Sequence, residues 1–342
     1  MSLRLVLATT VLKNWRAASF NVSGAYLYSL VDETILVEPP VAFLLELQGK
    51  VLFLKKALYG MWQAGRCWWK FLSGILARMG FIATEVNQSL YIFRNEKTII
   101  TIWIHVDNGV VASNSAEAIS SFKDALCAEL NIKWLDVVQQ IVGLECAIGE
   151  GEVTIVQRQL TNSILDAYPR PILRRNSPLP IFPAGVLMLD AEILDPTPFW
   201  SVIGSLAYLV GGSRPDLTFA MNYLVRHSMG PTADHWFLLG QVIGYLLKTC
   251  VHGIRIFPGD LSLSLWSDAG WGGDLKCLQT GFVIKLGDAP ILWGSKQQAM
   301  VALLTCAAEY VALSDSTQHF MQAINQLTQL AGNFNKTIFC NN

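Results

Sequence analysis

The sequence of 342 residues predicts an α+β protein whose last part changes to an α/β pattern. Thr101–Ser113 holds two β-branched apolar runs around a polar tip, which is typical of a β-hairpin. Residues 169–198 contain seven prolines and indicate an extended linker. From Leu261, three strand-like runs precede a long helical run and one more strand, an order that places a helix against a sheet.

Apolar periodicity predicts the other elements in order. Helices are expected over 3–15, 68–81, 116–130 and 157–168, with a helical region over 199–245, and strands over 20–27, 85–93 and 142–156. In the last part, strands are expected over 261–268, 280–286, 289–295 and 336–340, with a helix over 299–331. Residues 213–216 and 231–234 both signal helix starts, because each combines a capping hydroxyl or a proline with an acid.

The composition excludes two classes of protein. Hydrophobic residues make up 52% of the chain and charged residues 15%, which is far from the composition of disordered proteins. Gly, Ser or charged residues interrupt every apolar run before it reaches about 18 residues, so no transmembrane helix is expected. Residues 1–18 imitate a signal peptide, but Lys13 and Arg16 interrupt the apolar part and argue against export. The net charge of -1 argues neither for nor against a nucleic-acid ligand.

The cysteines and histidines show no metal-ligand spacing. Seven cysteines occur without a Cys-x-x-Cys pair, and such a set predicts reduced thiols in the cytoplasm or the nucleus. His227 and His235 are eight residues apart and have no cysteines near them in the sequence. Core or surface roles are therefore favoured over zinc binding for both.

The polar tip of the hairpin is the first candidate site. Asp107, Asn108 and Gly109 are placed there, with Asn-Gly as a favoured two-residue turn at or next to the tip. A carboxylate at such a tip is exposed while the strands hold it rigid, as a metal or phosphate site requires. An ordinary surface turn is the alternative, since Asp, Asn and Gly are common turn residues.

The hairpin and four other segments resemble the Pol polyprotein of Ty1/copia-type retrotransposons. His105–Asn108 is similar to the Tyr-Val-Asp-Asp motif of their reverse transcriptases. The other similar segments are Phe20–Leu27 (FNVSGAYL), Leu54–Trp69 (LKKALYGMWQAGRCWW), Ser201–Asn222 and Trp266–Leu313. The matches keep the order and the approximate spacing of the family, and they imply an RNA-directed DNA polymerase with RNase H.

The resemblance also implies the domains and the partners. Residues 1–168 would form a polymerase palm of the right-hand reverse transcriptase type with the fingers largely missing. Residues 169–260 would be the linker and a helical thumb or connection, and 261–342 a truncated α/β RNase H-like domain. The implied partners are an RNA template, a DNA primer and the RNA–DNA hybrid, in the virus-like particle of the family.

At the polymerase site, the resemblance implies three aspartates that hold two Mg²⁺ ions. The matching positions are Asn21, Asp107 and Asn108, so one carboxylate of three remains. An amide offers one neutral oxygen and one NH₂ donor, whereas Mg²⁺ requires anionic oxygen. Each lost carboxylate removes on the order of 4 kcal/mol of attraction to a doubly charged ion, even at the dielectric constant of water. We therefore expect impaired polymerase catalysis.

The resemblance places the Tyr59-Gly60 segment beside the incoming nucleotide. The substrate-binding positions that it implies are Tyr59, Gly60, Gln63 and Arg66. Glycine fits there because the backbone can approach a ligand closely. Trp62 stands where the family usually has Lys or Arg, and the loss of that cation weakens triphosphate binding. The alternative for this segment is a buried aromatic start of a helix with solvated lysines.

At the RNase H site, the resemblance assigns the first acid to Asp268 and the helix acid to Glu309. The third acidic position is Asn341, which is again an amide. The metal-ligand candidates of the whole chain are thus Asp107, Asp268 and Glu309. The glycine-rich residues 270–273 suggest phosphate binding, but a turn after the first strand explains them more simply.

Asparagine replaces aspartate at four positions of the family pattern, namely Asn21, Asn87, Asn108 and Asn341. One G-to-A transition per codon explains each change, and independent loss at each site is the competing account. We expect a catalytically impaired polyprotein fragment. The alternatives are a non-catalytic remnant that binds RNA–DNA hybrid, an active enzyme that tolerates Asn108 or uses Mn²⁺, and a misfolded product.

Overall fold

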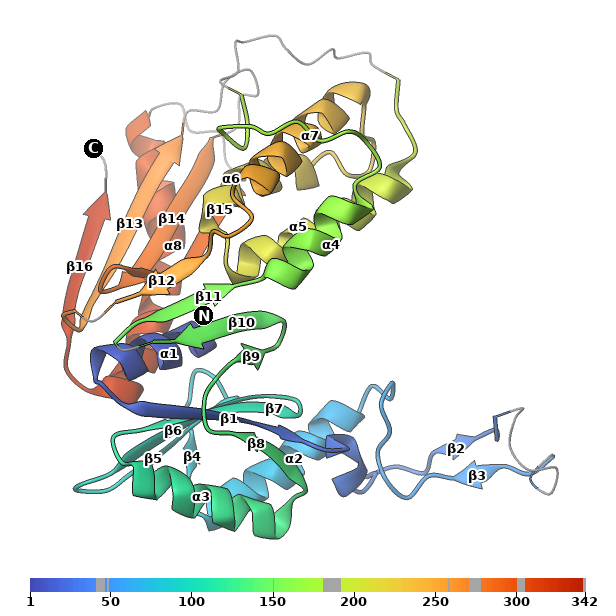
Figure 1. Ribbon diagram of the computed structural model, residues 1–342, viewed down its shortest axis with the longest axis vertical. Coiled ribbons are helices and arrows are strands. Elements are labelled where there is room, and N and C mark those ends of the chain that lie inside the picture. The colour runs from blue at the N-terminus through green and yellow to red at the C-terminus, as the bar shows by residue number, and fades with distance from the viewer. Residues whose placement is uncertain are drawn as a thin grey trace. The chain divides into compact units, whose positions relative to one another are not determined.

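A computed structural model describes residues 1–40, 47, 49–149, 151–180, 192–257, 259–270, 278–299 and 305–340. The chain forms two compact units. The amino-terminal unit consists of Ser2 and residues 15–138, and the carboxy-terminal unit consists of Met1 and residues 3–14 and 139–342. Both units mix helices with antiparallel strands, which confirms a protein of α and β elements (Figure 1).

A six-stranded antiparallel sheet organises the amino-terminal unit, in the order β4-β5-β6-β7-β1-β8. Its strands are β1 (Arg16–Val22), β4 (Ile82–Ala83), β5 (Leu90–Arg94), β6 (Ile99–His105), β7 (Asn108–Ser113) and β8 (Ile132–Leu135). The first strand of the chain thus lies between the hairpin β6–β7 and the last strand of the unit. A two-stranded sheet of β2 (Leu36–Val37) and β3 (Leu52–Phe53) and the 3-10 helix η1 (Ala25–Tyr28) complete the unit.

Helices α2 (Ala64–Arg78) and α3 (Ala116–Glu129) share one hydrophobic core with the six-stranded sheet. Apolar residues of α2 recur at three- and four-residue intervals, so they form one face that packs on the strands. Ser115 caps α3 by accepting a hydrogen bond from the N–H of Ala118 at 3.1 Å. The helix predicted over 68–81 exists, but it begins four residues earlier and ends at Arg78.

The carboxy-terminal unit contains two four-stranded sheets. The first has the order β12-β11-β10-β9 and the second the order β15-β14-β13-β16. The strands are β9 (Gln140–Ile141), β10 (Leu144–Ile148), β11 (Val153–Val156), β12 (Ile254–Ile256), β13 (Ser262–Gly270), β14 (Gln279–Leu286), β15 (Ala289–Gln297) and β16 (Asn335–Cys340). Among these described strands, only β13 and β16 pair in parallel. The long helix α8 (Thr305–Ala331) packs on β13 and β14.

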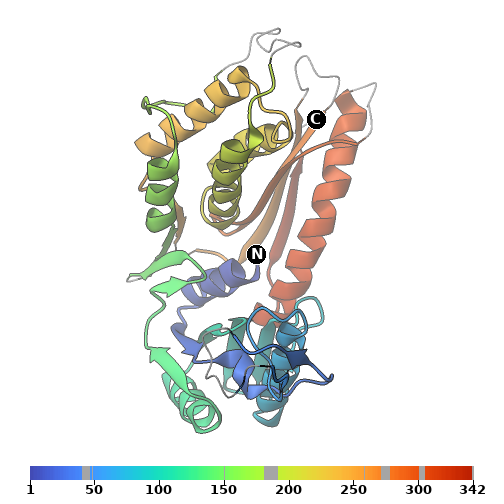
Figure 2. The same cartoon turned by 90° about the vertical axis from the view of Figure 1, so that its right-hand side faces the viewer.

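The other helices of this unit are α1 (Ser2–Leu12), α4 (Arg158–Ala167), α5 (Pro196–Gly212), α6 (Thr218–Val225) and α7 (Ala233–Lys248), with the 3-10 helix Pro215–Leu217. The second sheet has α8 along one face, while α5 and α6 lie on the side of the opposite face (Figure 2). Helices α4 to α7 bury an apolar core of their own. The region predicted as helical over 199–245 is therefore confirmed, broken at Ser213 and again at residues 226–232.

Two buried arginines tie parts of the carboxy-terminal unit together. Arg4 donates from Nε to the carbonyl of Ile291 at 2.8 Å, and its guanidinium lies 4.2 Å from the centre of the Trp293 ring. Arg214 is 1% exposed and pairs with Asp216 at 2.8 Å. Of the predicted linker 169–198, residues 169–180 and 192–195 contain no helix or strand, but the linker was predicted too long, because α5 already begins at Pro196. No helix of the described residues is long and apolar enough to cross a membrane.

Two histidines stack inside the helical part of this unit. The rings of His227 and His235 have centroids 4.1 Å apart. Nδ1 of His235 accepts the N–H of Thr232 at 3.0 Å, and within the described residues Nε2 of both rings is buried without a hydrogen-bond partner. Burial, followed by the positive charges of His235 and Arg226, lowers the pKa of His227 to about 4, and burial also lowers the pKa of His235.

This histidine pair predicts a loss of stability in mild acid. The folded state keeps the pKa of His227 near 4, against 6.5 in the unfolded chain, so the unfolded state binds more protons between these values. The free energy of unfolding is therefore unaffected by His227 above pH 6.5, and it falls as the pH drops from 6.5 towards 4. Because His227 is only partly buried, we expect a loss of about 1 to 2 kcal/mol. Urea unfolding at pH 7.5 and pH 4.5 measures it.

The double variant His227→Gln/His235→Gln should lose less stability than the unaltered chain between these two pH values. An equal loss in both chains would show that other groups cause the acid sensitivity.

Candidate functional site

The tip of the hairpin β6–β7 differs from the tip that the sequence predicts. His105 pairs with Asn108, so the two turn residues are Val106 and Asp107. Asn108 and Gly109 belong to β7 and were wrongly expected at the tip. The Asn-Gly preference for turns is thus overridden here, because both residues are needed in the strand that pairs with β1.

The turn puts Val106 in a backbone conformation that suits glycine. Its φ is 57°, and a positive φ at the first turn position is the geometry of a type II′ turn. A β-branched residue is strained in this region. The indole Nε1 of Trp68, which is 3% exposed, donates to the carbonyl of Val106 at 2.6 Å and holds the turn in place. Asp107 is therefore presented on a fixed backbone.

The structure brings the three predicted polymerase positions together. Asn21 in β1 lies opposite Asn108 in β7, and the N–H of Val22 donates to the carbonyl of Asp107 at 2.7 Å. Asn21 Nδ2 lies 3.5 Å from Asn108 Oδ1, which is a long hydrogen bond. Asn108 Nδ2 donates to Asp107 Oδ1 at 2.8 Å. The two amides and the carboxylate thus form one chain of hydrogen bonds.

This set of donors does not fit a pair of divalent cations. A side-chain NH₂ group points at the carboxylate of Asp107, where a cation ligand would offer a lone pair. One anionic oxygen group and two neutral amides cannot balance the charge of two Mg²⁺ ions. Among the residues that the structure describes, no group of three or more His, Cys, Asp or Glu side chains is placed to hold a metal.

Gly109 is needed for packing. A Cβ atom built on Gly109 would lie 2.2 Å from the ring of Phe20, well inside van der Waals contact. Phe20 is 3% exposed and stacks on Trp134 with centroids 5.9 Å apart, so the ring has no free space to enter. Phe20 immediately precedes Asn21, and the close approach of β1 to β7 therefore depends on a glycine at 109.

The predicted substrate-binding positions lie in the chain between β1 and the hairpin β6–β7. The ring of Tyr59 lies 4.4 Å from that of Tyr26, and its pKa is raised by burial and then by the negative charge of Asp107. The carboxylate of Asp107 at the hairpin tip thus acts electrostatically on Tyr59. Gly60 has a φ of 94°, which a residue with a side chain rarely adopts. Gln63 and Arg66 stand just before and in the first turn of α2.

The predicted RNase H positions lie in the carboxy-terminal unit. Glu309 of α8 accepts the N–H of Ala269 at 3.1 Å, next to Asp268 in β13. Burial raises the pKa of the Cys340 thiol, and the carboxylates of Glu309 and Asp268 raise it further, so these three side chains are neighbours. Cys340 pairs with Ser267 across the parallel strands. Asn341 follows Cys340 but lies outside the described residues, as do 271–273 of the glycine-rich cluster.

Sequence reasoning missed the residues that support the hairpin. Trp68 holds the turn, and Phe20 sets the spacing between β1 and β7. The only signal in the sequence for the second contact is a glycine inside an apolar strand, which often marks a close approach of another group. Nothing in the sequence links Trp68 to Val106, because 37 residues separate them and the contact depends on the tertiary fold.

A family model and several known proteins point to one family. Residues 1–170 match the family model described as reverse transcriptase (RNA-dependent DNA polymerase). The whole chain is 30% identical to the Pol polyprotein from transposon RE2 of Arabidopsis thaliana and covers 24% of that protein. Over 92% of the chain, it is 26% identical to the Pol polyprotein from transposon TNT 1-94 of Nicotiana tabacum, of which it covers 25%. The chain therefore spans about a quarter of the length of these relatives. Over 86% of the chain, it is 27% identical to the putative transposon Ty5-1 protein of Saccharomyces cerevisiae and covers 98% of it.

The contact of Phe20 with Gly109 predicts the result of a double-mutant cycle. Gly109→Ala should destabilise the chain by about 2 kcal/mol, because the new methyl group overlaps a buried ring. Phe20→Leu shortens the ring that it meets, so the double variant should be more stable than the sum of the two single changes predicts. Urea unfolding measures all three variants.

Gly74→Ala in α2 is the control, since nothing lies within 4 Å of its Cβ, and it should stabilise the chain by up to about 1 kcal/mol. Additive effects at 20 and 109 would disprove the packing role.

Proposed function

The chain belongs to the Ty1/copia type of retrotransposon Pol polyproteins, and from this premise we propose that it is a reverse transcriptase and RNase H region without polymerase activity. Residues 1–168 act as the polymerase palm, and the sheet of β13 to β16 with α8 acts as the RNase H part. The nucleic acids that this region evolved to hold are an RNA template, a DNA primer and their hybrid.

One observation carries the proposed loss of activity. At the place where the palm would hold its metals, Asn21 donates to Asn108, and Asn108 donates to Asp107. Mg²⁺ would supply the chemistry of nucleotidyl transfer by lowering the charge on the attacking and leaving oxygens. The residues present satisfy one another and leave a single carboxylate, so the site cannot hold the two ions that this chemistry needs.

We propose that the RNase H site also binds divalent cations weakly, because it too has lost a carboxylate. Asp268 and Glu309 supply two carboxylates, while Asn341 stands at the third position of the family pattern. One oxygen of Glu309 already accepts a backbone N–H. Two carboxylates leave a divalent cation with water for most of its ligands, and its affinity falls accordingly.

Primer extension on an RNA template tests the proposal for the polymerase site. The unaltered chain is compared with the variant Asn21→Asp/Asn108→Asp in Mg²⁺ and again in Mn²⁺. Restoring two carboxylates returns on the order of 4 kcal/mol of cation attraction each, so we expect incorporation to rise at least about 1,000-fold. Nucleotide incorporation by the unaltered chain at a comparable rate would overturn the proposal.

The control variant is Asn87→Asp/Asn95→Asp, which adds the same charge at two turns. Oδ1 of each of these residues accepts backbone N–H groups, and an aspartate can do the same. This variant should stay inactive. Salt-dependent binding of RNA–DNA hybrid without extension by any variant would favour the non-catalytic binding remnant instead.

A further inference from the structure

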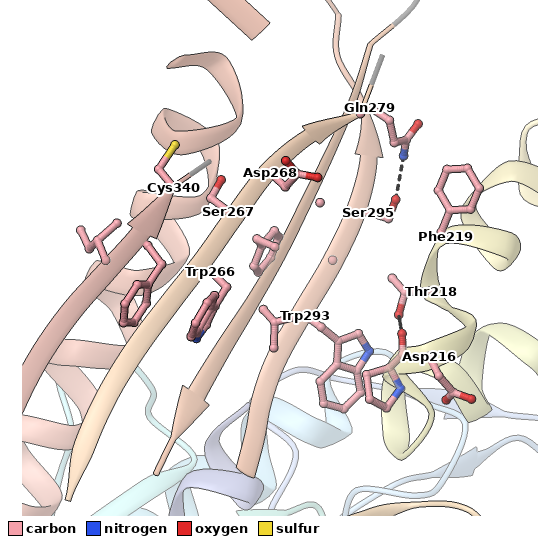
Figure 3. Close-up of a pocket in the computed structure, with 18 residues that line it drawn as sticks. Asp216, Thr218, Phe219, Trp266, Ser267, Asp268, Gln279, Trp293, Ser295 and Cys340 are labelled. Carbon is pink, nitrogen blue, oxygen red and sulfur yellow. Dashed lines mark hydrogen bonds between the residues drawn. The ribbon is translucent and has the colours of Figure 1, made fainter. Parts of the chain in front are cut away.

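A groove lies over the second sheet of the carboxy-terminal unit, on the face opposite α8. Its volume is about 690 Å³, and Pro215, Phe219 and neighbouring residues of the α6 side form its wall (Figure 3). Trp293, Val283, Trp266 and Phe339 pair in register across β15, β14, β13 and β16, so their side chains point to the same face. The groove therefore has an aromatic row along its floor.

The aromatic row is open to solvent at one end. The rings of Trp266 and Phe339 are stacked with centroids 4.1 Å apart, and they are 46% and 42% exposed. On this face of β14, the residues beside Trp266 are Val283, which is small, and Gly281, which has no side chain. They leave open space next to the indole ring. A flat ring can enter there and extend the stack on the side of Trp266 away from Phe339, after the flexible side chain of Lys285, which lies over the indole, has turned aside.

The charges around the groove favour one orientation of a ligand. Lys285 Nζ lies 5.6 Å from the centre of the Trp266 ring, at the rim next to Ser264. Asp268 lies on the same face beyond Trp266, in the opposite direction along β13. Asp216 lines the wall, but Arg214 pairs with it and offsets its charge. A phosphate is attracted to the end with Lys285 and repelled from the end with Asp268.

We propose that this groove binds single-stranded nucleic acid by stacking an unpaired base on Trp266. The phosphate next to that base lies at Lys285, and Phe339 supports the indole from its other side. Aromatic side chains exposed on a sheet, with a cation beside them, are suited to unpaired bases because every base has a π-face. The inference rests on the proposed function, since it takes nucleic acid as the ligand of this region.

The test measures the binding of a labelled 12-nucleotide DNA strand by fluorescence anisotropy, beside a strand of equal length and charge with abasic central positions. The unaltered chain should bind the abasic strand about 10-fold more weakly. Trp266→Leu should lose about 10-fold for the intact strand and nothing for the abasic strand. Trp266→Phe keeps a ring and should stay within about 3-fold of the unaltered chain.

Two further variants separate stacking from charge and from general surface effects. Lys285→Ala should weaken both strands equally and reduce the dependence of affinity on salt. Trp200→Leu changes a tryptophan of α5 that is 45% exposed, outside the groove, and should change nothing. A strand carrying 5-iodouracil should form a light-induced crosslink to the peptide that contains Trp266 or Phe339, which reports contact without any variant.

Equal binding of intact and abasic strands, or equal loss for Trp266→Leu and Trp266→Phe, would overturn the stacking site. If RNA–DNA hybrid still bound in those cases, the proposed function would stand while this inference failed. A failure of the chain to bind any of these nucleic acids would overturn both. Full binding by Trp266→Leu together with capture of a polypeptide on this face would identify the groove as a protein interface and also reject the inference.

Discussion

The approach of β1 to β7 is the contact on which the amino-terminal unit depends. The ring of Phe20 occupies the space that a side chain at Gly109 would need, and this fixes the spacing of the two strands in the centre of the sheet. Their register then places Asn21 opposite Asn108, one residue from the turn. The packing of two apolar groups thus decides which polar groups meet at the candidate site.

An asparagine side chain has nearly the shape of an aspartate side chain but carries no charge. Asn87 illustrates this, because its Oδ1 accepts the N–H of Ser89 at 2.9 Å, a bond that an aspartate makes equally well. At Asn21 and Asn108 the amide group also keeps the size of the carboxylate, and its NH₂ group adds donors that a neighbouring oxygen can use. An exchange of one side chain for the other would therefore leave the backbone of the site intact, and the proposed loss of activity is compatible with this folded structure.

Local patterns in the sequence predicted the elements better than the contacts between them. The hairpin, α3, α4 and the strand–strand–strand–helix–strand order of the last part are all present, because each has a clear apolar period. The tip of the hairpin was predicted at residues 107–109 and lies at 106–107, since Gly109 serves a contact with Phe20 that no local pattern shows. The groove beside Trp266 was not foreseen either, because it requires the register of three consecutive strands and of β16, which follows after the long helix α8.

The hydrogen-bonded amides at the hairpin tip have a consequence for how this unit responds to chelators. Three carboxylates at about 4 Å from one another repel by roughly 1 kcal/mol per pair in water, and more where water is excluded. A tip of that kind needs counter-ions to keep its shape. Here one carboxylate and two amides attract one another, and the repulsion is absent. The tip therefore needs no bound cation to hold its side chains together, and we expect it to keep its geometry when a chelator removes all divalent ions.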